Sequence, residues 1–228
     1  SFSLDGSVGS SSGNASFTGS GYLGSGWIPE SWILQADGEM RDLAFFRQYC
    51  LDVCPDITSA FFSLSGSGSG FGMNIRGSAG VRGLEMEGMS AERVSIDGTL
   101  NYSTRSIIAG IPFGVSFDGG IEVLGLKAEG VAADTASLEG TFGIAGSSMS
   151  ADASLLIDSL RVLSDVFHTT ADIKLDEYGI RIDGLTLAGS ADRLYTAEIE
   201  VGIGDTTSFR VEEIRATHSK LRVITSGG

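Results

Sequence analysis

Proline, histidine and cysteine are all rare in this chain of 228 residues, which contains three prolines, two histidines and two cysteines. The two histidines, His168 and His218, lie far apart, and neither has a second histidine three or four positions away, the spacing that zinc sites use. A chain with so little proline and 42% hydrophobic residues is also unlike a disordered low-complexity segment. We therefore expect an ordered protein with no metal site and no cofactor.

Long hydrophobic runs are absent as well. No apolar stretch approaches the ~18–20 residues of a membrane-spanning helix, and the N-terminus lacks the basic and apolar regions of a signal peptide. The chain begins with Phe2-Ser-Leu4-Asp-Gly6, one copy of a sequence pattern that recurs along the chain and is described below, and it ends with Ser226-Gly227-Gly228. We expect a fragment of a longer protein, with any targeting or anchoring segment outside these 228 residues.

Positive charge is scarce relative to negative charge. Lysine and arginine number 15 against 29 aspartates and glutamates, which gives a formal net charge of −14 and a pI near 4.4. Such a surface repels phosphate backbones and anionic headgroups, so nucleic acid is not an expected partner. The simplest role of the excess acid is to keep a sheet-rich protein in solution.

Signals for catalysis are weak. No Gly-x-Ser-x-Gly elbow joins a strand to a helix. Residues 66–72 have the glycine density of a phosphate loop, but the residues that follow read as a strand and not as the helix such a loop needs. Acidic Gly-Gly-x-Gly-x-Asp calcium repeats are missing too. We expect no catalytic residues and predict that the chain is not an enzyme.

The two cysteines form one Cys-x-x-x-Cys pair, Cys50 and Cys54. Residues four apart in an intact helix are badly placed for a disulfide, but Pro55 ends any helix there and allows local unwinding. A local structural disulfide, which implies an oxidising compartment, and a pair of buried free thiols both fit this pattern.

What the chain does have is a recurring phrase, apolar–x–apolar–x–Gly, at intervals of ten or eleven residues. Examples are Val94-Ser-Ile96-Asp-Gly98, Val115-Ser-Phe117-Asp-Gly119 and Ala136-Ser-Leu138-Glu-Gly140. Alternation with period two puts the apolar side chains on one face of a strand, and glycine permits the positive φ of a turn or bulge. The fold is therefore predicted to be mainly β, a single elongated domain over residues 1–228.

An antiparallel meander, with strands of about eight residues and tight glycine turns, accounts for this interval. A β-solenoid with two phrases in each coil, or a β-sandwich, is the alternative. Residues 39–53 break the pattern, and their helical spacing predicts one amphipathic helix near residues 40–53, within an insertion at about 39–56. Residues 153–167 are ambiguous, because they fit either a helical stripe or two short strands.

The apolar face of such a sheet has to be covered, because leaving it in water costs ~25 cal/mol per Å². A second sheet, the predicted helix, a partner or a lipid-like ligand could cover it. Several phrases place alanine or methionine beside a larger residue, which suits a surface that accommodates mobile chains.

The spacing of alternating apolar segments and glycines over residues 80–225 resembles that of the AsmA-like and TamB-like proteins of bacterial envelopes. The residues that carry this resemblance are the run from Ala153 to Val162, the run from Thr170 to Gly189 with its Asp183-Gly184, and the run from Phe209 to Val223. In these families short alternating strands separated by Asp-Gly or Gly recur in the same way. The first 80 residues depart from the pattern.

The resemblance implies a long sheet curled into a groove or taco, anchored in the inner membrane by a segment outside this chain and projecting through the periplasm. Its apolar lining would carry phospholipid acyl chains towards the outer membrane. The lining residues would be Phe2, Phe62, Leu64, Leu84, Met86, Val94, Ile96, Phe117, Leu138, Ile180, Ile182 and Leu187. We therefore expect a periplasmic lipid-binding module. The alternative is a structural cell-surface module, an adhesin or solenoid passenger with a self-sealed core.

Overall fold

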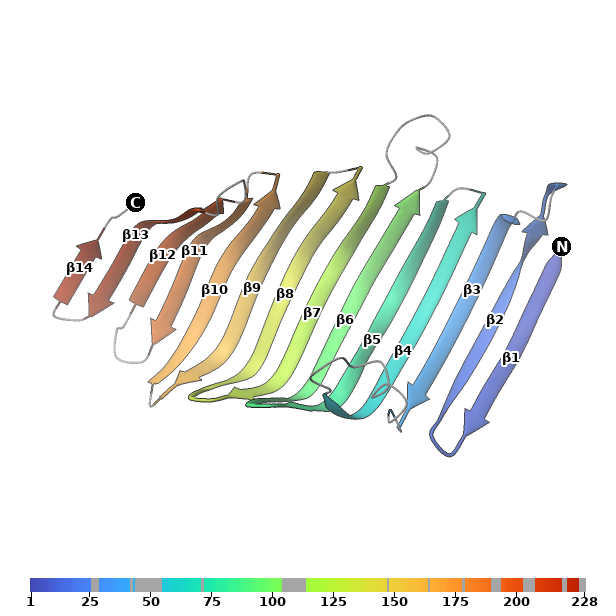
Figure 1. The fold of residues 1–228 in the computed structure, drawn as a ribbon, viewed down its shortest axis with the longest axis horizontal. Coiled ribbons are helices and arrows are strands. Elements are labelled where there is room, and N and C mark those ends of the chain that lie inside the picture. The colour runs from blue at the N-terminus through green and yellow to red at the C-terminus, as the bar shows by residue number, and fades with distance from the viewer. Residues whose placement is uncertain are drawn as a thin grey trace.

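A computed structural model of the chain describes residues 1–25, 29–41, 43, 55–70, 72–103, 114–146, 148–163, 165–177, 179–189, 194–202, 208–218 and 221–225. They form one 14-stranded antiparallel sheet in which every strand pairs with its neighbours in sequence (Figure 1). The strands are β1 (Phe2–Ser10), β2 (Gly13–Leu23), β3 (Pro29–Met40), β4 (Asp56–Ser69), β5 (Gly72–Met86), β6 (Met89–Ser103), β7 (Gly114–Ala128), β8 (Val131–Ala145), β9 (Ser148–Val162), β10 (Asp165–Asp176), β11 (Gly179–Gly189), β12 (Leu194–Gly202), β13 (Ser208–His218) and β14 (Leu221–Thr225).

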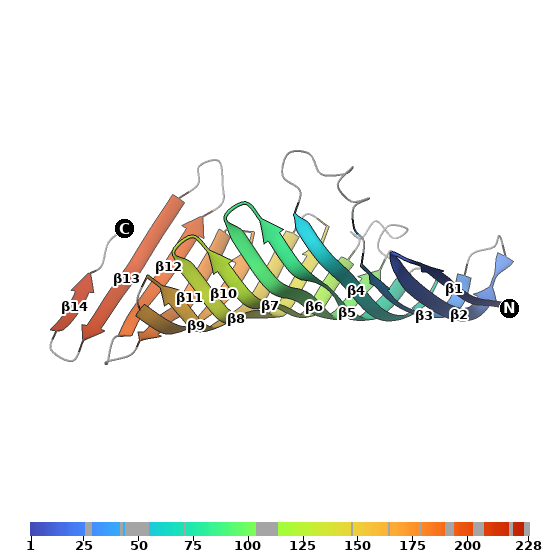
Figure 2. The ribbon, with the colours of Figure 1, turned by 90° about the horizontal axis from the view of Figure 1, so that it is seen from below.

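This topology confirms the mainly β prediction and the antiparallel meander. The solenoid and sandwich alternatives are wrong for the described residues, because these lie in a single open sheet whose strand pairs are all antiparallel. The sheet has the twist that L-residues impose on neighbouring strands, which is visible along its length in Figure 2.

The helix predicted near residues 40–53 finds no support in the part of the chain that the structure describes. Met40 ends strand β3, where it pairs with Ala60 of β4, and neither Arg41 nor Leu43 lies in a helix. Met40 sits in a strand because its backbone completes the ladder that joins β3 to β4. Residues 42 and 44–54 lie outside the described residues. The rest of the predicted helix and the predicted pairing of Cys50 with Cys54 fall within these undescribed residues.

The strands are longer than the predicted eight residues. β5 to β9 each have 15 residues, and two phrases fall within one strand and its turn. Gly88 and Gly130 lie in turns with φ of 75° and 73°, whereas Gly98, Gly119 and Gly140 lie within β6, β7 and β8. The prediction that these three glycines mark turns was therefore wrong, since glycine at a turn and glycine inside a strand look alike in sequence.

The hairpin is the true repeating unit in the middle of the sheet. β7 and β8 begin and end 42 positions after β5 and β6. Gly114 at the start of β7 is thus equivalent to Gly72 at the start of β5, and Ala145 at the end of β8 is equivalent to Ser103 at the end of β6. Both hairpins turn at Glu-Gly, which is Glu87-Gly88 in the first and Glu129-Gly130 in the second. The pairings from β4 to β9 show no register shift, so equivalent residues of the two hairpins line up across the sheet.

The described residues of the ambiguous segment at 153–167 lie in two strands, apart from Leu163, which lies in the turn between them with φ of 57°. Residues up to Val162 belong to β9, and β10 starts at Asp165. Leu155 pairs with Leu138 of β8 and with Ala171 of β10, so the backbone of this segment is engaged on both sides. These two ladders decide the conformation, because a helix would leave the edges of β8 and β10 unpaired here.

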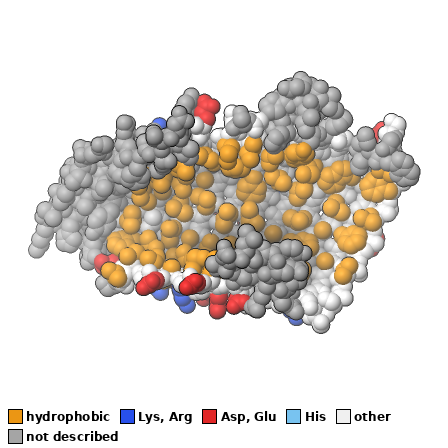
Figure 3. Space-filling view, viewed as in Figure 1, with side chains coloured by type: hydrophobic (Ala, Val, Ile, Leu, Met, Phe, Trp, Pro, Cys, Tyr) orange, Lys and Arg blue, Asp and Glu red, His pale blue; other side chains and the backbone are white. Residues whose placement is uncertain are grey.

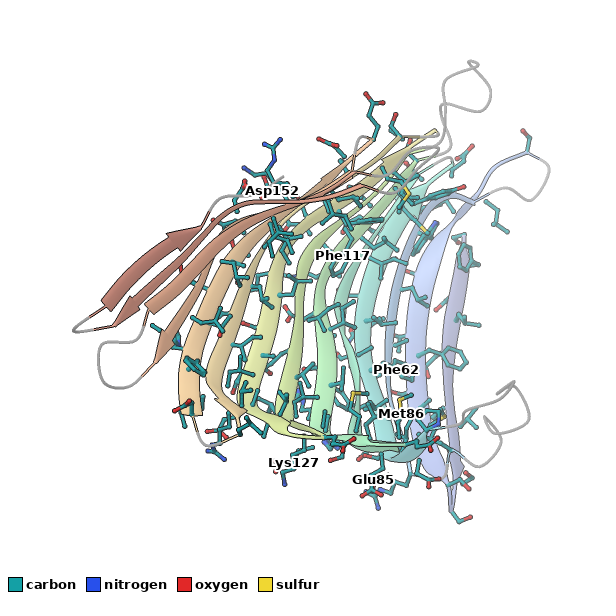
Figure 4. All side chains as sticks on the ribbon, turned by 60° about the vertical axis from the view of Figure 1, so that its left-hand side comes forward. Phe62, Glu85, Met86, Phe117, Lys127 and Asp152 are labelled. Atoms are coloured by element: carbon teal, nitrogen blue, oxygen red, sulfur yellow. The ribbon has the colours of Figure 1, made fainter. Side chains whose placement is uncertain are left out.

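One residue with positive φ interrupts each of β5, β7 and β9, at the twelfth position of the strand. These residues are Gly83 (φ 61°), Gly125 (φ 62°) and Ser159 (φ 54°). The strands in the middle of the sheet bend near one of their ends, the end at which Figure 4 labels Glu85, Met86 and Lys127. A left-handed residue breaks the alternation of side chains, so residues beyond it no longer follow the two-face pattern of the flat part.

The sheet has almost no interior. Among the described residues the buried hydrophobic side chains are Leu43, Ala91, Ala133 and Ala171, and no large side chain is fully buried. Ala91 and Ala133 lie beyond the bend, where Ala91 pairs with Leu84 of β5 and Ala133 pairs with Leu126 of β7. The flat part of the sheet is a single layer, and both of its faces consist of partly exposed side chains.

Candidate functional site

Apolar side chains gather in rows on one face of the sheet, because residues paired across antiparallel strands point to the same side. The first row is Phe62, Ala79, Ile96, Ile121, Leu138 and Leu155, on β4 to β9. A second row, four residues away along the strands, contains Ile75, Leu100, Phe117 and Phe142, on β5 to β8. We call the surface carrying these rows the apolar face. Figure 3 shows hydrophobic side chains spread across it, with charged side chains at its margin.

This face is not covered by the described part of the chain. Ile96 and Ile121, in the middle of the sheet, keep 40% and 41% of their surface exposed, and Leu64 keeps 37%. Interior strands of a self-contained protein bury such side chains. At ~25 cal/mol per Å² the open face represents a substantial unfavourable contact with water.

A row of glycines runs between the two apolar rows. Gly77, Gly98, Gly119 and Gly140 are successive cross-strand partners on β5 to β8. A Cβ placed on Gly119 would lie 2.6 Å from Cα of Gly98 and 2.8 Å from the Phe117 ring. The backbones are therefore too close for any other residue here, and the Phe117 ring lies where a side chain of Gly98 or Gly119 would point.

The opposite face is polar, and its side chains bond to one another across the strands. Ser63 Oγ donates to Asp37 Oδ1 at 2.6 Å, and Ser154 Oγ donates to Asp172 Oδ1 at 2.8 Å. Asn74 Nδ2 donates to Asn101 Oδ1 at 2.6 Å. These polar cross-strand pairs suit a face in contact with water, so the two sides of the sheet meet different environments.

One aromatic ring on the polar face is held between cations. The guanidinium carbons of Arg82 and Arg93 lie 4.8 Å and 4.9 Å from the centroid of the Phe61 ring. Arg82 and Arg93 are themselves direct cross-strand partners, and Arg82 Nη1 binds Glu39 Oε1 at 3.2 Å. The ring and the carboxylate offset the repulsion between the two arginines, so we assign this cluster a structural role.

A pocket of about 610 Å³ opens at the end of β5 to β9 opposite the bend. Its walls come from Gly72, Met73, Asn101, Tyr102, Ser103, Gly114, Val115, Ser116, Gly143, Ile144, Ala145, Ser148 and Ser150. None of these side chains is charged, although the chain as a whole carries 44 charged residues. The volume lies in the range of small-molecule sites, and the lining suits an uncharged occupant.

The structure brings most of the sequence-predicted lining residues together on the apolar face. Register and alternation place Phe2, Phe62, Leu64, Val94, Ile96, Phe117, Leu138, Ile180, Ile182 and Leu187 there. Leu84 and Met86 lie beyond the bend at Gly83, outside the flat part of the face. The sequence pattern that contains Leu84 and Met86 ends at Gly88, which lies in the turn between β5 and β6. These two residues therefore lie at the end of the sheet.

Sequence reasoning missed several residues of the same face, which are Ile75, Leu100, Ile121, Phe142, Leu155, Ile173 and Leu175. Each belongs to an alternating run, so period two could have found them. What the sequence alone did not provide is the register that aligns one strand with the next.

Among the described residues no group of three or more His, Cys, Asp or Glu side chains is placed to hold a metal ion. His168 Nδ1 lies 3.4 Å from Asp158 Oδ1 on an exposed surface. No described helix is both long enough and apolar enough to cross a membrane. The residues described thus offer an apolar surface and a pocket as their candidate sites.

No protein-family model matches the chain, and neither the curated proteins nor the solved structures contain a match to it. A functional assignment therefore depends on the chemistry of the sheet itself.

Proposed function

We propose that this chain is a lipid-binding module whose apolar face shields phospholipid acyl chains during transport between membranes. The observation that carries the proposal is the exposure of Ile96 and Ile121 on interior strands of a sheet with almost no core of its own. A hydrocarbon chain is the occupant that satisfies such a surface, because the rows offer dispersion contacts and no charge.

The dimensions of the face suit that occupant. Apolar residues continue from Phe62 on β4 to Ile180 and Ile182 on β11. Eight strands at ~4.8 Å spacing span about 34 Å. Half of a ~30 Å hydrocarbon core, about 15 Å, is the length one acyl chain occupies in a bilayer. The face is therefore long enough for two acyl chains placed end to end across the strands.

The contrast between the two faces supports the same proposal. Hydrogen-bonded pairs such as Asp37–Ser63 and Asn74–Asn101 make the outer face compatible with water. A module of this kind would hold lipid on one side while the other side remains solvated. The resemblance to AsmA-like and TamB-like envelope proteins supports a periplasmic location, with the sheet curled into a groove and a membrane anchor outside this chain.

The competing function, a cell-surface structural module with a self-sealed core, has less support. A self-sealed module needs a second layer that buries the rows. In the described ranges, hydrophobic burial is limited to Leu43 and three alanines, which is far less than one layer packed on another would produce.

The test is a measurement of lipid bound to the protein purified from a bacterial envelope. We expect phospholipid to co-purify, and the double variant Ile96→Asp/Ile121→Asp to lose about tenfold or more of it, because two carboxylates would enter the acyl-chain site. The matched control is Ile33→Asp. Ile33 is 65% exposed, and it pairs with Ser20 and Ser67 on the polar face.

The control should keep its lipid, and circular dichroism should show that all three proteins retain the sheet. Absence of lipid from the parent chain, or equal loss in the polar-face control, would contradict the proposal. Unfolding of the double variant would instead indicate a packed interior under the rows, and a single Ile121→Ser variant then provides the same comparison at lower cost in stability.

A further inference from the structure

The pocket at the strand ends opposite the bend is built mainly from two rows of cross-strand partners on the polar face. The row nearer the middle of the strands contributes Asn101, Ser116, Gly143 and Ser150. The row at the strand ends contributes Gly72, Ser103, Gly114, Ala145 and Ser148. Both rows lie on the polar face, because they share the side of the sheet on which Asn74 bonds to Asn101.

The other wall residues of the pocket contribute backbone. They lie between the two rows along their strands, and alternation turns their side chains to the apolar face; they are Met73, Tyr102, Val115 and Ile144. Leu100 and Phe117, which follow on the apolar face of β6 and β7, do not line the pocket. The pocket is therefore separate from the surface that we propose for acyl chains.

Two glycines keep the floor of the pocket open. A Cβ on Gly114 would have no neighbour within 4 Å, and a Cβ on Gly72 would meet only the backbone oxygen of Tyr102, at 3.5 Å. Neither glycine has the positive φ that would require glycine for the backbone. The missing side chains at these two positions are thus what makes room for a ligand.

The side chains that line the pocket offer uncharged hydrogen-bonding groups. Its four serines are exposed, and none of their hydroxyls has a hydrogen-bond partner among the described residues. Asn101 accepts from Asn74 through Oδ1, which leaves the Nδ2 group of Asn101 available to donate. Because a hydroxyl both donates and accepts, the pocket presents both kinds of group to a ligand.

Charge is absent from the two rows on β4 to β9, although the next row of the same face carries Arg76, Asp118 and Asp152. A phosphate group would call for cationic partners, and a calcium or magnesium ion would call for carboxylates. A hydrocarbon would take water from the hydroxyls without replacing its hydrogen bonds. The lining therefore favours a neutral ligand that is rich in hydroxyl groups.

We propose that this pocket binds a neutral oligosaccharide. A sugar ring carries hydroxyls around its edge and C–H groups on its two faces. Its hydroxyls would bond to the serines and to Asn101, while one face would lie on the backbone at Gly72 and Gly114. The volume of about 610 Å³ is in the range of ligand sites. The inference concerns the polar face and does not depend on what occupies the apolar face.

Isothermal titration calorimetry with three neutral hexasaccharides, maltohexaose, cellohexaose and chitohexaose, tests the proposal. We expect saturable binding of at least one of them with a Kd of about 1 mM or lower. Gly114→Leu should weaken that binding at least about tenfold, because the new side chain occupies the open floor. The matched control is Thr141→Leu, which adds the same side chain to the next row of the polar face. It should bind like the parent.

A second variant tests the hydrogen bonds and keeps the floor unchanged. Ser116→Ala/Ser150→Ala should weaken binding at least about fivefold, since two hydrogen bonds to the sugar are lost. Circular dichroism should show the sheet in all variants, and if Gly114→Leu fails to fold, the serine variant decides. Absence of saturable binding to all three sugars would overturn the proposal. Binding that the serine variant leaves unchanged, or that Thr141→Leu weakens equally, would overturn it too.

Discussion

Gly98 of β6 and Gly119 of β7 face one another so closely that neither position has room for a Cβ. A Cβ on Gly98 would lie 2.8 Å from Cα of Gly119 and 2.8 Å from the Phe117 ring. The glycine row thus fixes how near β5 to β8 approach each other. It also determines how the ring of Phe117 lies across the apolar face.

Gly119→Ala should destabilise the sheet by about 1–3 kcal/mol, because the added methyl group must push β6 and β7 apart or displace the Phe117 ring. Urea unfolding measures this loss. Gly114→Ala, on the same strand, is the control: a Cβ there has no neighbour within 4 Å, and φ is not positive. A similar loss of stability in both variants would contradict the close approach of the strands.

Ser159→Gly should stabilise the chain by about 1 kcal/mol, since a left-handed conformation costs most residues that amount and costs glycine nothing. Ser159 has φ of 54° at the twelfth position of β9, where β5 and β7 carry Gly83 and Gly125. The midpoint of urea unfolding should rise. Ser150→Gly, in the extended part of β9, should lower it instead, and a fall in both would show that Ser159 is not strained.

Phe61→Leu should cost about 1–2 kcal/mol, because both cation–π contacts, each worth about 0.5–1 kcal/mol at exposed sites, are lost and Arg82 and Arg93 are left opposed. A double-mutant cycle with Arg93→Met isolates the contact between the ring and Arg93. We expect a coupling energy of about 0.5–1 kcal/mol from unfolding in urea. A coupling energy of zero would mean that the ring and the guanidinium do not interact.

Alternation with period two was sufficient to predict that the chain is mainly β and that apolar side chains share one face of a strand such as β6. Val94, Ile96 and Leu100 alternate with polar residues in the sequence and lie on one face of β6. The interval of the glycines was misleading, because Asp97-Gly98 reads as a turn but lies inside a strand, whereas Glu87-Gly88 is a turn. Cross-strand contact with Gly119, not local preference, is what requires glycine at position 98.

The candidate site was predictable only in outline. Sequence identified Phe117 and Leu138 as lining residues but not their partners Leu100 and Ile121, because pairing depends on register across strands that are far apart in the chain. The assignment of Met40 to a helix failed for a related reason. Its helical spacing was outweighed by a strand ladder with β4 that local sequence does not reveal.

The most direct test of the open apolar face is photo-crosslinking from a benzophenone side chain introduced at Ile121, with the same group at Ile33 as the reference. After exposure to phospholipid vesicles and light, the account predicts a covalent lipid adduct at position 121, detected by mass spectrometry, and none at position 33. Crosslinks at position 121 that lead only to other residues of the same chain would show that the protein covers this face itself, and would contradict the account.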